Sequence, residues 1–381
     1  MRKGANLGNW LVLEKWMSPE LFSGAEADDE TGLCAALGDV ARQERFKTHR
    51  DSYITERDFA LIAAAGIDTV RIPVPFFVFG GIEPFVGCIE YLDKAFDWAE
   101  AYGLQILLDL HTVPGSQNGF DNGGLCGVCV WHKHPDDVEF VVDLLGRLAA
   151  RYGRRPGLWG IEALNEPVSA ELWELADIPT RYPAADPALA AQSEPVPTEL
   201  LKGFYRDAYQ RIRAEAPNTT VIFHDGFRID ELADFFLGAG FENYIVDTHL
   251  YYMMFGFGTG PQDLGGYLDL TNSHFGRAVH PANGLPRIVG EWCLDTLTAG
   301  APLPPEAERQ SYYRQLADAQ LRTWEHTEGW FFWSYKLSVE GRDHDAWDFG
   351  KSLALGYLPV TLAAEDEGRP TSSREGVVQA R

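Results

Sequence analysis

The stretch LWGIEALNEP, residues Leu158 to Pro167, is an apolar run that ends in an amide, a carboxylate and a proline. Its first residues have the composition of a buried strand, and the proline ends the strand because it has no backbone N–H to donate. A buried charge without a partner is costly. The adjacent pair Asn165 and Glu166 at the end of this run therefore indicates either a partner elsewhere in the fold or a chemical function.

Seven further runs of the same kind lie along the chain. They are ANLGNWL (5–11), DTVRIPVP (68–75), LQILLDLH (104–111), TTVIFHDG (219–226), YIVDTHLYY (244–252), PRIVGEWC (286–293) and GWFFWSYK (329–336). The runs are almost continuously apolar, which is typical of parallel strands that are covered on both faces. Between several of them the apolar residues have helical spacing, as over residues 89–99 and 138–148. Eight strands that alternate with helices predict an α/β fold, a (β/α)8 TIM barrel.

The length of 381 residues fits one such barrel, and no linker or internal repeat divides the chain. We expect a single domain over residues 1–360 with elaborated loops after its strands. The polar tail at 361–381 is expected to be poorly ordered. Residues 168–200 are rich in proline and alanine and have no sustained period, so they are predicted to form a long loop after the fourth strand.

Charge restricts the possible partners. The chain has 32 basic and 56 acidic residues and a net charge of -24, which would repel nucleic acid and anionic membranes. A neutral partner is therefore favoured. No run is long enough to span a membrane, and the first residues lack the uninterrupted apolar segment of a signal peptide. The sequence predicts a cytoplasmic protein, or a secreted one if a signal was removed, and it says nothing about oligomeric state.

Five cysteines leave at least one unpaired, which favours a reducing compartment. Cys126 and Cys129 have the spacing of half a zinc site, but no second half with matching spacing follows. We interpret them as two loop thiols, and no metal site is predicted.

The last residues of the eight runs are polar. In a barrel of this type they meet at one end, where the active site is built. In chain order they are Asn6, Arg71, Asp109 with His111, Asn165 with Glu166, His224 with Asp225, Asp247 with His249 and Tyr251, Glu291, and Trp333. Each one taken singly has a structural interpretation, such as an ion pair or a buried imidazole, but their gathering at strand ends favours a site.

Two glutamates in this set, Glu166 and Glu291, come from the fourth and seventh runs. Two carboxyl groups that face each other across a barrel mouth suit glycosidic hydrolysis, in which one protonates the leaving oxygen and the other attacks the anomeric carbon or activates water. This chemistry requires that the two pKa values differ. Arg71 is the natural group to keep one of them ionised. No cofactor is expected, because the carboxyl groups supply acid, base and nucleophile.

The runs ANLGNWLVLEKWMSPELF, RIPVPFFVF, LDLHTVPGSQNGFDNGG, IEALNEP, DTHLYY, GEWC and GWFFWSYK resemble glycoside hydrolase family 5, in particular its exo-β-1,3-glucanase-like branch. The resemblance covers roughly residues 4 to 360 in chain order. It implies a (β/α)8 barrel that hydrolyses β-glucosidic bonds with retention through a covalent glycosyl-enzyme. The expected substrate is a β-1,3-glucan or its oligosaccharides.

The resemblance also implies a role for each matching position. Glu166 of the Asn-Glu-Pro motif would be the acid/base, and Glu291 of the Gly-Glu-Trp motif the nucleophile. The supporting and substrate-binding positions are Asn165 for the sugar 2-hydroxyl, Arg71 to keep the nucleophile charged, Tyr251 to hydrogen-bond it, His249 beside the two carboxylates, His111 for substrate binding, Glu14 for the hydroxyls of the non-reducing sugar, Trp333 beneath the sugar ring, and Phe120 as one wall of an aromatic clamp for the next sugar.

Three departures from the branch concern the choice of substrate. Thr112 replaces a usual glycine, and Met254 stands where a second clamp phenylalanine is expected, with Phe255 one residue away. The inserts around GLCGVCVWHKH and after LNEP would lie on the rim of the pocket, where loops decide between exo and endo action. A β-1,6-linked, aryl or lipid glucoside therefore stays open as an alternative substrate.

Two other classes of function are considered. A metal-dependent barrel hydrolase would use His111, His224 and His249 with a carboxylate, but the sequence lacks the paired His-x-His expected on an early strand. A carbohydrate-binding protein without catalysis would not need both glutamates.

Overall fold

Eight parallel strands close into one barrel in the order in which they occur along the chain, because β1 pairs with both β2 and β8. The computed structural model describes residues 1–255, 260–280, 284–339 and 341–359. The strands are β1 (Arg2–Asn6), β2 (Thr69–Val74), β3 (Gln105–Leu110), β4 (Leu158–Glu162), β5 (Thr220–His224), β6 (Tyr244–His249), β7 (Arg287–Trp292) and β8 (Gly329–Phe332). Each strand overlaps one of the eight apolar runs, so the predicted (β/α)8 barrel is confirmed.

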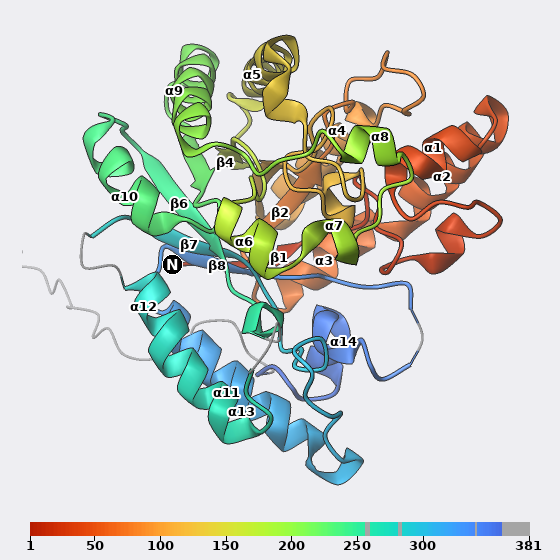
Figure 1. Ribbon diagram of the computed structural model, residues 1–381. Coiled ribbons are helices and arrows are strands. Elements are labelled where there is room, and N and C mark those ends of the chain that lie inside the picture. Colours follow the sequence, from red (N-terminus) through yellow and green to blue (C-terminus); the bar gives the residue numbers. More distant parts are fainter. Residues whose placement is uncertain (256–259, 281–283, 340, 360–381) are drawn as a thin grey trace, which may run out of the picture.

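Helices surround the strands, with α5, α9 and α10 on one side and α11 and α13 on another (Figure 1). Their bounds are α1 (Glu30–Ala36), α2 (Asp39–Tyr53), α3 (Glu56–Ala64), α4 (Ile89–Tyr102), α5 (Pro135–Tyr152), α6 (Ala170–Leu175), α7 (Ile178–Arg181), α8 (Pro187–Ala190), α9 (Thr198–Glu215), α10 (Ile229–Gly238), α11 (Leu264–Leu270), α12 (Gly276–Val279), α13 (Glu306–Trp324) and α14 (Phe349–Ala354).

The two helices predicted from apolar spacing are α4 and α5. Each buries one stripe against the barrel, and the stripes meet where the rings of Phe96 and Tyr152 stack at 4.2 Å between centroids. Helix α4 ends at Gly103, which adopts the left-handed conformation that glycine tolerates best. The helical spacing at 89–99 and 138–148 therefore marks the faces that pack on the strands.

The barrel interior has two halves of different character. Side chains of Leu107, Ile222, Ile245, Ile288 and Phe331 fill one half and form a separate apolar cluster. Burying a side chain of this size stabilises a protein by about 1.5–3 kcal/mol. The other half, towards the carboxyl ends of the strands, holds the charged and polar residues described below.

The long connection after β4 is not irregular throughout. It contains the short helices α6, α7 and α8, which the absence of a sustained apolar period did not predict. Residues 360–381 lie outside the described residues, so the predicted tail at 361–381 is not tested, and the division into domains stays a prediction.

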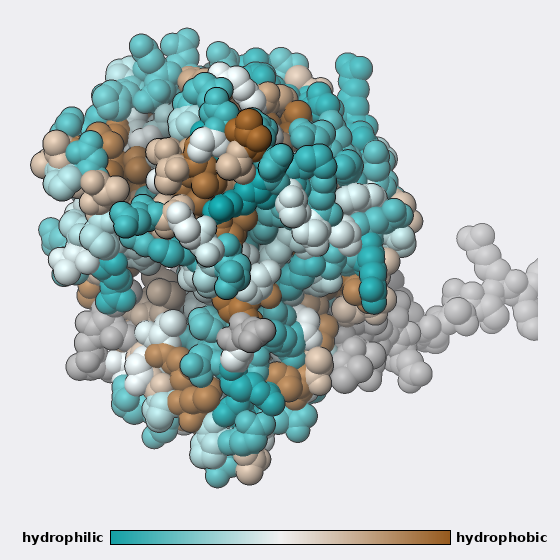
Figure 2. Space-filling view, turned by 90° about the vertical axis from the view of Figure 1, so that its right-hand side faces the viewer, coloured by the Kyte–Doolittle hydropathy of each residue, from teal (hydrophilic) through white to brown (hydrophobic). Residues whose placement is uncertain are grey.

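The outer surface fits the acidic composition. On the face shown in Figure 2, hydrophilic residues prevail and the hydrophobic patches are small. Among the described helices, none combines the length and the apolar character that a membrane span requires.

Candidate active site

A cavity of about 390 Å³ opens at the carboxyl ends of the strands. Six of the residues predicted for the site line it: Glu14, Phe120, Glu166, Tyr251, Glu291 and Trp333. The other four are at most 1% exposed. Arg71 lies within β2 and not at its end, where the sequence had suggested it, whereas His249 ends β6 and His111 and Asn165 follow β3 and β4. The structure therefore brings together all ten residues, six on the wall and four beneath it.

Arg71 is the centre of the polar half of the barrel. Its guanidinium donates through Nη1 to Glu291 Oε1 at 2.8 Å, and through Nη2 to Asn165 Oδ1 at 2.9 Å. It also donates through Nε to Glu162 Oε2 at 2.9 Å. Burial opposes its charge, but the carboxylates of Asp109, Glu162 and Glu291 raise the pKa of Arg71, so it stays charged.

Glu291 accepts a second hydrogen bond from the hydroxyl of Tyr251, 2.7 Å from Oε2. Arg71 and Tyr251 thus hold one oxygen each and fix the plane of the carboxylate. Burial raises the pKa of Glu291, and His249 and Arg71 oppose this rise. Two donors on an ionised carboxylate favour the charged form, which a nucleophile needs.

The backbone before Glu291 requires a glycine. A Cβ atom on Gly290 would lie 1.8 Å from Asp247 Oδ2, and the N–H of Gly290 donates to Asp247 Oδ1 at 2.6 Å. The Gly-Glu sequence therefore places Asp247 against the strand that carries Glu291.

Glu166 is held by His249 and Asn122. Its Oε1 lies 2.7 Å from His249 Nδ1, and its Oε2 accepts from the Asn122 side chain at 2.8 Å. The backbone of Glu166 has φ 46°, a left-handed conformation that is rare outside glycine and is concentrated at functional sites. The turn after β4 thus directs Glu166 into the cavity while Asn165 stays beneath it.

His249 connects the two carboxylates. Its Nδ1 lies 2.7 Å from Glu166 Oε1 and 3.5 Å from Glu291 Oε2. Burial alone would lower the pKa of His249, but the charges of Glu291 and Asp247 raise it well above its usual value. These charges therefore favour the protonated ring, in which Nδ1 donates to Glu166.

The two carboxyl pKa values are shifted in opposite directions, as expected, but in the unexpected order. Burial would raise the pKa of Glu166, yet the hydrogen bond and charge of His249 lower it below its ordinary value. Glu291 has the raised pKa. The sequence could not predict this order, because it depends on how closely the His249 ring approaches Glu166.

His111, Asn165 and Trp333 form the floor of the cavity. His111 Nδ1 lies 2.6 Å from Asp109 Oδ2, which orients the ring. The His111 and Trp333 rings stack at 5.7 Å with 7° between their planes. Asn165 Oδ1 accepts from Arg71, and its Nδ2 lies 3.5 Å from His111 Nε2.

Glu14 lies at the side of the cavity formed by the loops after β1 and β8. Its Oε2 accepts from Trp16 Nε1 at 2.9 Å, and its Oε1 has no hydrogen-bond partner among the described residues. Burial raises the pKa of Glu14, and Asp121 adds to the rise. Such an oxygen suits the hydroxyl of a bound sugar.

Sequence reasoning missed several residues of the site. One of them is Glu162, which lies within an apolar run. A charged residue in a strand that is otherwise apolar could have indicated it. Three rings and a carboxylate come from loops whose course the sequence does not indicate, and they line the cavity: Trp16, Asp121, His344 and Trp347. Tyr182 also lines it, from the end of α7.

Within the described part of the chain, two sets of side chains could approach a metal ion, one of Glu166, His224 and His249 and one of Glu162, Asp247 and His249. His111 belongs to neither set, so the ligand group considered from the sequence is only partly assembled. His249 is shared by both sets. Cys126 and Cys129 are buried free thiols outside both sets.

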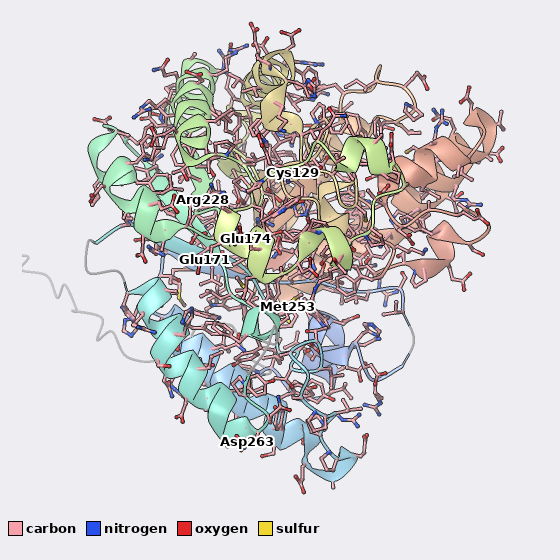
Figure 3. The ribbon with its side chains drawn as sticks, in the orientation of Figure 1. Cys129, Glu171, Glu174, Arg228, Met253 and Asp263 are labelled. Carbon is pink, nitrogen blue, oxygen red and sulfur yellow. The ribbon has the colours of Figure 1, made fainter. Side chains whose placement is uncertain are left out.

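The position of the expected second clamp phenylalanine is occupied by Met254. Met253 and Met254 line the cavity, and in Figure 3 Met253 lies between helix α6 and the helices α11 and α13. Phe255 instead contacts the rings of His274 and Phe275. Thr112 is buried, and its hydroxyl accepts from the Phe76 N–H at 3.4 Å.

Comparison with known proteins agrees with this geometry. The family model described as cellulase (glycosyl hydrolase family 5) matches residues 34–337. Two relatives are each named probable glucan 1,3-beta-glucosidase A. The protein from Emericella nidulans is 34% identical and the one from Aspergillus niger 32%. Each alignment covers 94% of this chain, with 90% and 87% of the relatives.

Among solved structures, AoRut superposes with a TM-score of 0.74 at 23% identity, covering 94% of this chain and 96% of its own. A rutinosidase from Aspergillus niger superposes with a TM-score of 0.73 at 22% identity, with coverages of 93% and 97%. These two show the shared fold. The family model and the relatives above 30% identity go further: the chain belongs to glycosyl hydrolase family 5 and is an O-glycosyl hydrolase.

Proposed function

We propose that the protein is a retaining, exo-acting β-glucosidase that removes glucose from β-1,3-glucan or its oligosaccharides. The names of the relatives support the substrate class, and the arrangement of Glu166 and Glu291 supports the reaction. The whole of residues 1–360 would act as one catalytic domain.

The observation that carries retention is the distance between the two carboxylates. Glu166 Oε1 and Glu291 Oε2 lie 2.7 and 3.5 Å from the same nitrogen of His249, so these oxygens are at most 6.2 Å apart. Retaining glycosidases have carboxyl groups about 5–5.5 Å apart, whereas inverting ones need about 6.5–9.5 Å to admit a water. This upper limit on one pair of oxygens supports the shorter separation of a retaining enzyme.

In the first step, Glu291 attacks the anomeric carbon and forms an ester to the sugar as the bond to the leaving oxygen breaks. Glu166 donates a proton to that oxygen, and the leaving group departs as an alcohol. In the second step, Glu166 takes a proton from water, whose oxygen attacks the anomeric carbon and releases Glu291 as a carboxylate. The two inversions together retain the β-configuration.

The proton for the first step is held by His249 and Glu166 together. At 2.7 Å, a proton on His249 Nδ1 can shift to Glu166 Oε1 without any change in the charge of the pair. A coupled pair of this kind titrates as a unit. The lowered pKa of Glu166 in the empty site is therefore compatible with its role as acid, because its proton remains available on His249.

Exo action is supported by the side of the cavity that carries Glu14. This buried carboxylate stands with Trp16 and Trp347, whose rings lie 5.3 Å apart between centroids. Two indole rings beside a hydroxyl acceptor suit the terminal sugar of a chain.

The test is to incubate the purified protein with β-1,3-, β-1,4- and β-1,6-linked glucosides and to identify the products by size and anomeric configuration. We expect glucose, released first as the β-anomer, with the β-1,3 bond cleaved fastest. Glu291→Ala should abolish turnover, and added azide should partly restore it with an inverted product. Glu171→Gln, on the exposed face of α6, is the matched control. Unchanged activity in both Glu291→Ala and Glu166→Ala would disprove the proposal.

A further inference from the structure

The order of strands in the barrel divides the cavity into two sides. Glu166 follows β4, whereas Trp333 follows β8, on the opposite side of the closed barrel. Because Glu166 protonates the leaving oxygen in the proposed reaction, the leaving group must lie on the side built by the loops after β3 to β6. The residues lining that side include Phe120, Leu172, Tyr182, Phe227 and Met253.

Two aromatic rings on this side of the cavity are in tilted contact. Phe120, in the loop after β3, and Tyr182, in the connection after β4, have centroids 5.4 Å apart and planes inclined by 58°. Tyr182 is half-buried, so part of its ring is covered and part is open to the cavity. The second phenylalanine of a clamp is missing here, since Met254 takes its place and Phe255 packs against Phe275.

The connection that carries Tyr182 is fixed to the loop that carries Phe120. A Cβ atom on Gly127 would lie 2.3 Å from the carbonyl oxygen of Tyr182, so the two backbones are in direct contact. A Cβ atom on Gly119 would meet Ile178 of α7 at 3.2 Å. Further along, the N–H of Cys129 donates to Ser193 Oγ at 2.9 Å. The segment that contains Cys126 and Cys129 therefore packs against the connection after β4 and helps to hold it in place.

We propose that Tyr182 determines specificity for the leaving group, and that with Phe120 it forms a platform for a ring with a flat apolar face. A glucosyl unit and an aryl aglycone share this chemistry, because both present a flat face of C–H groups or π-electrons to an aromatic side chain. The proposal rests on the proposed function, since it uses Glu166 to identify the leaving-group side. It gives the long connection after β4 a role that its sequence does not disclose.

Activity on three substrates distinguishes recognition of the leaving group by Tyr182 from a purely structural role of this residue. A β-1,3-linked glucose disaccharide has a sugar leaving group, 4-nitrophenyl β-D-glucoside an aryl one, and β-D-glucosyl fluoride a leaving group without a ring. We expect Tyr182→Ala to lower kcat/KM about tenfold for at least one of the two ring-bearing substrates, mainly through KM, while glucosyl fluoride is turned over as by the wild type. The larger of the two losses identifies which ring the platform serves.

Tyr182→Phe keeps the ring and should retain the wild-type preference. Tyr102→Ala, at an exposed tyrosine of α4, is the control for general effects of losing a tyrosine. If Tyr182→Ala does not fold, Tyr182→Leu fills the same space without a flat ring and should show the same selective loss. Equal losses for all three substrates, or no loss for either ring-bearing one, would overturn the proposal. Absence of turnover of every β-glucoside by the wild type would instead refute the proposed function.

Discussion

The hydroxyl of Tyr251 gives the sharpest test of how the nucleophile is kept ionised. Tyr251→Phe removes one donor, 2.7 Å from Glu291 Oε2, and leaves the hydrogen bond from Arg71 to Oε1 in place. A hydrogen bond to a charged group contributes about 1.5–3 kcal/mol. Since one pKa unit corresponds to about 1.4 kcal/mol, the pKa of Glu291 should rise by about one to two units.

The sign of the effect follows from the role of Glu291. Only its ionised form can attack, so activity is lost as the pH falls through its pKa. Loss of the donor destabilises the ionised form, and the acidic limb of the pH profile should therefore move to higher pH by about one to two units. The measurement is kcat/KM against pH, which reports groups of the free enzyme.

Tyr252→Phe is the matched control. Tyr252 is the next residue, and its hydroxyl is also buried and bonded, to Thr271 Oγ1 at 2.7 Å, away from the carboxylates. This variant should lose stability to a similar degree and keep the wild-type pH profile. An acidic limb that does not move in Tyr251→Phe, or that moves equally in Tyr252→Phe, would refute the reasoning.

Three other predictions concern the groups around the nucleophile. His249→Asn should move the alkaline limb of kcat/KM to lower pH, because the raised pKa of His249 keeps a proton near Glu166 as the pH rises. An alkaline limb that does not move would show that His249 does not hold this proton. Glu162→Ala removes a buried partner of Arg71 and should destabilise the fold by about 3–5 kcal/mol, whereas Glu162→Gln keeps an acceptor and should cost less; equal melting temperatures for the two variants would contradict this. Treatment with a chelator should leave activity unchanged, and a loss that zinc reverses would favour a metal-dependent reaction instead.

Much of the site could be predicted because it occupies strand ends. The carboxyl ends of parallel strands meet at one edge of a barrel, so the sequence order of Arg71, Asn165 and Glu291 places them together in space. This inference needs only the position of each residue within its run.

The remaining parts of the site depend on loops and on close approaches. Asn122 and Tyr182 come from segments with no apolar period, and their positions follow from backbone contacts such as that of Gly127 with Tyr182. A charge within an apolar strand points to Glu162, but the sequence does not indicate that its partner is Arg71. That pairing follows from the closed barrel. The order of the two carboxyl pKa values likewise depends on a distance, that of His249 from Glu166.

The pair Asn165 and Glu166 illustrates both what the sequence predicts and what it leaves open. The sequence indicates that two polar side chains follow a buried strand, and the structure shows that the left-handed conformation of Glu166 separates their directions. Asn165 binds Arg71 beneath the cavity, while Glu166 faces the ligand space.

Covalent trapping of the nucleophile tests the central claim most directly. The protein would be incubated with an activated 2-deoxy-2-fluoro-β-D-glucoside, whose fluorine slows the second step, and then digested and examined by mass spectrometry. The account predicts one adduct, an ester of the fluorosugar on Glu291. A fluorosugar attached to any other residue, or steady turnover to the α-anomer with no adduct at any time, would contradict it.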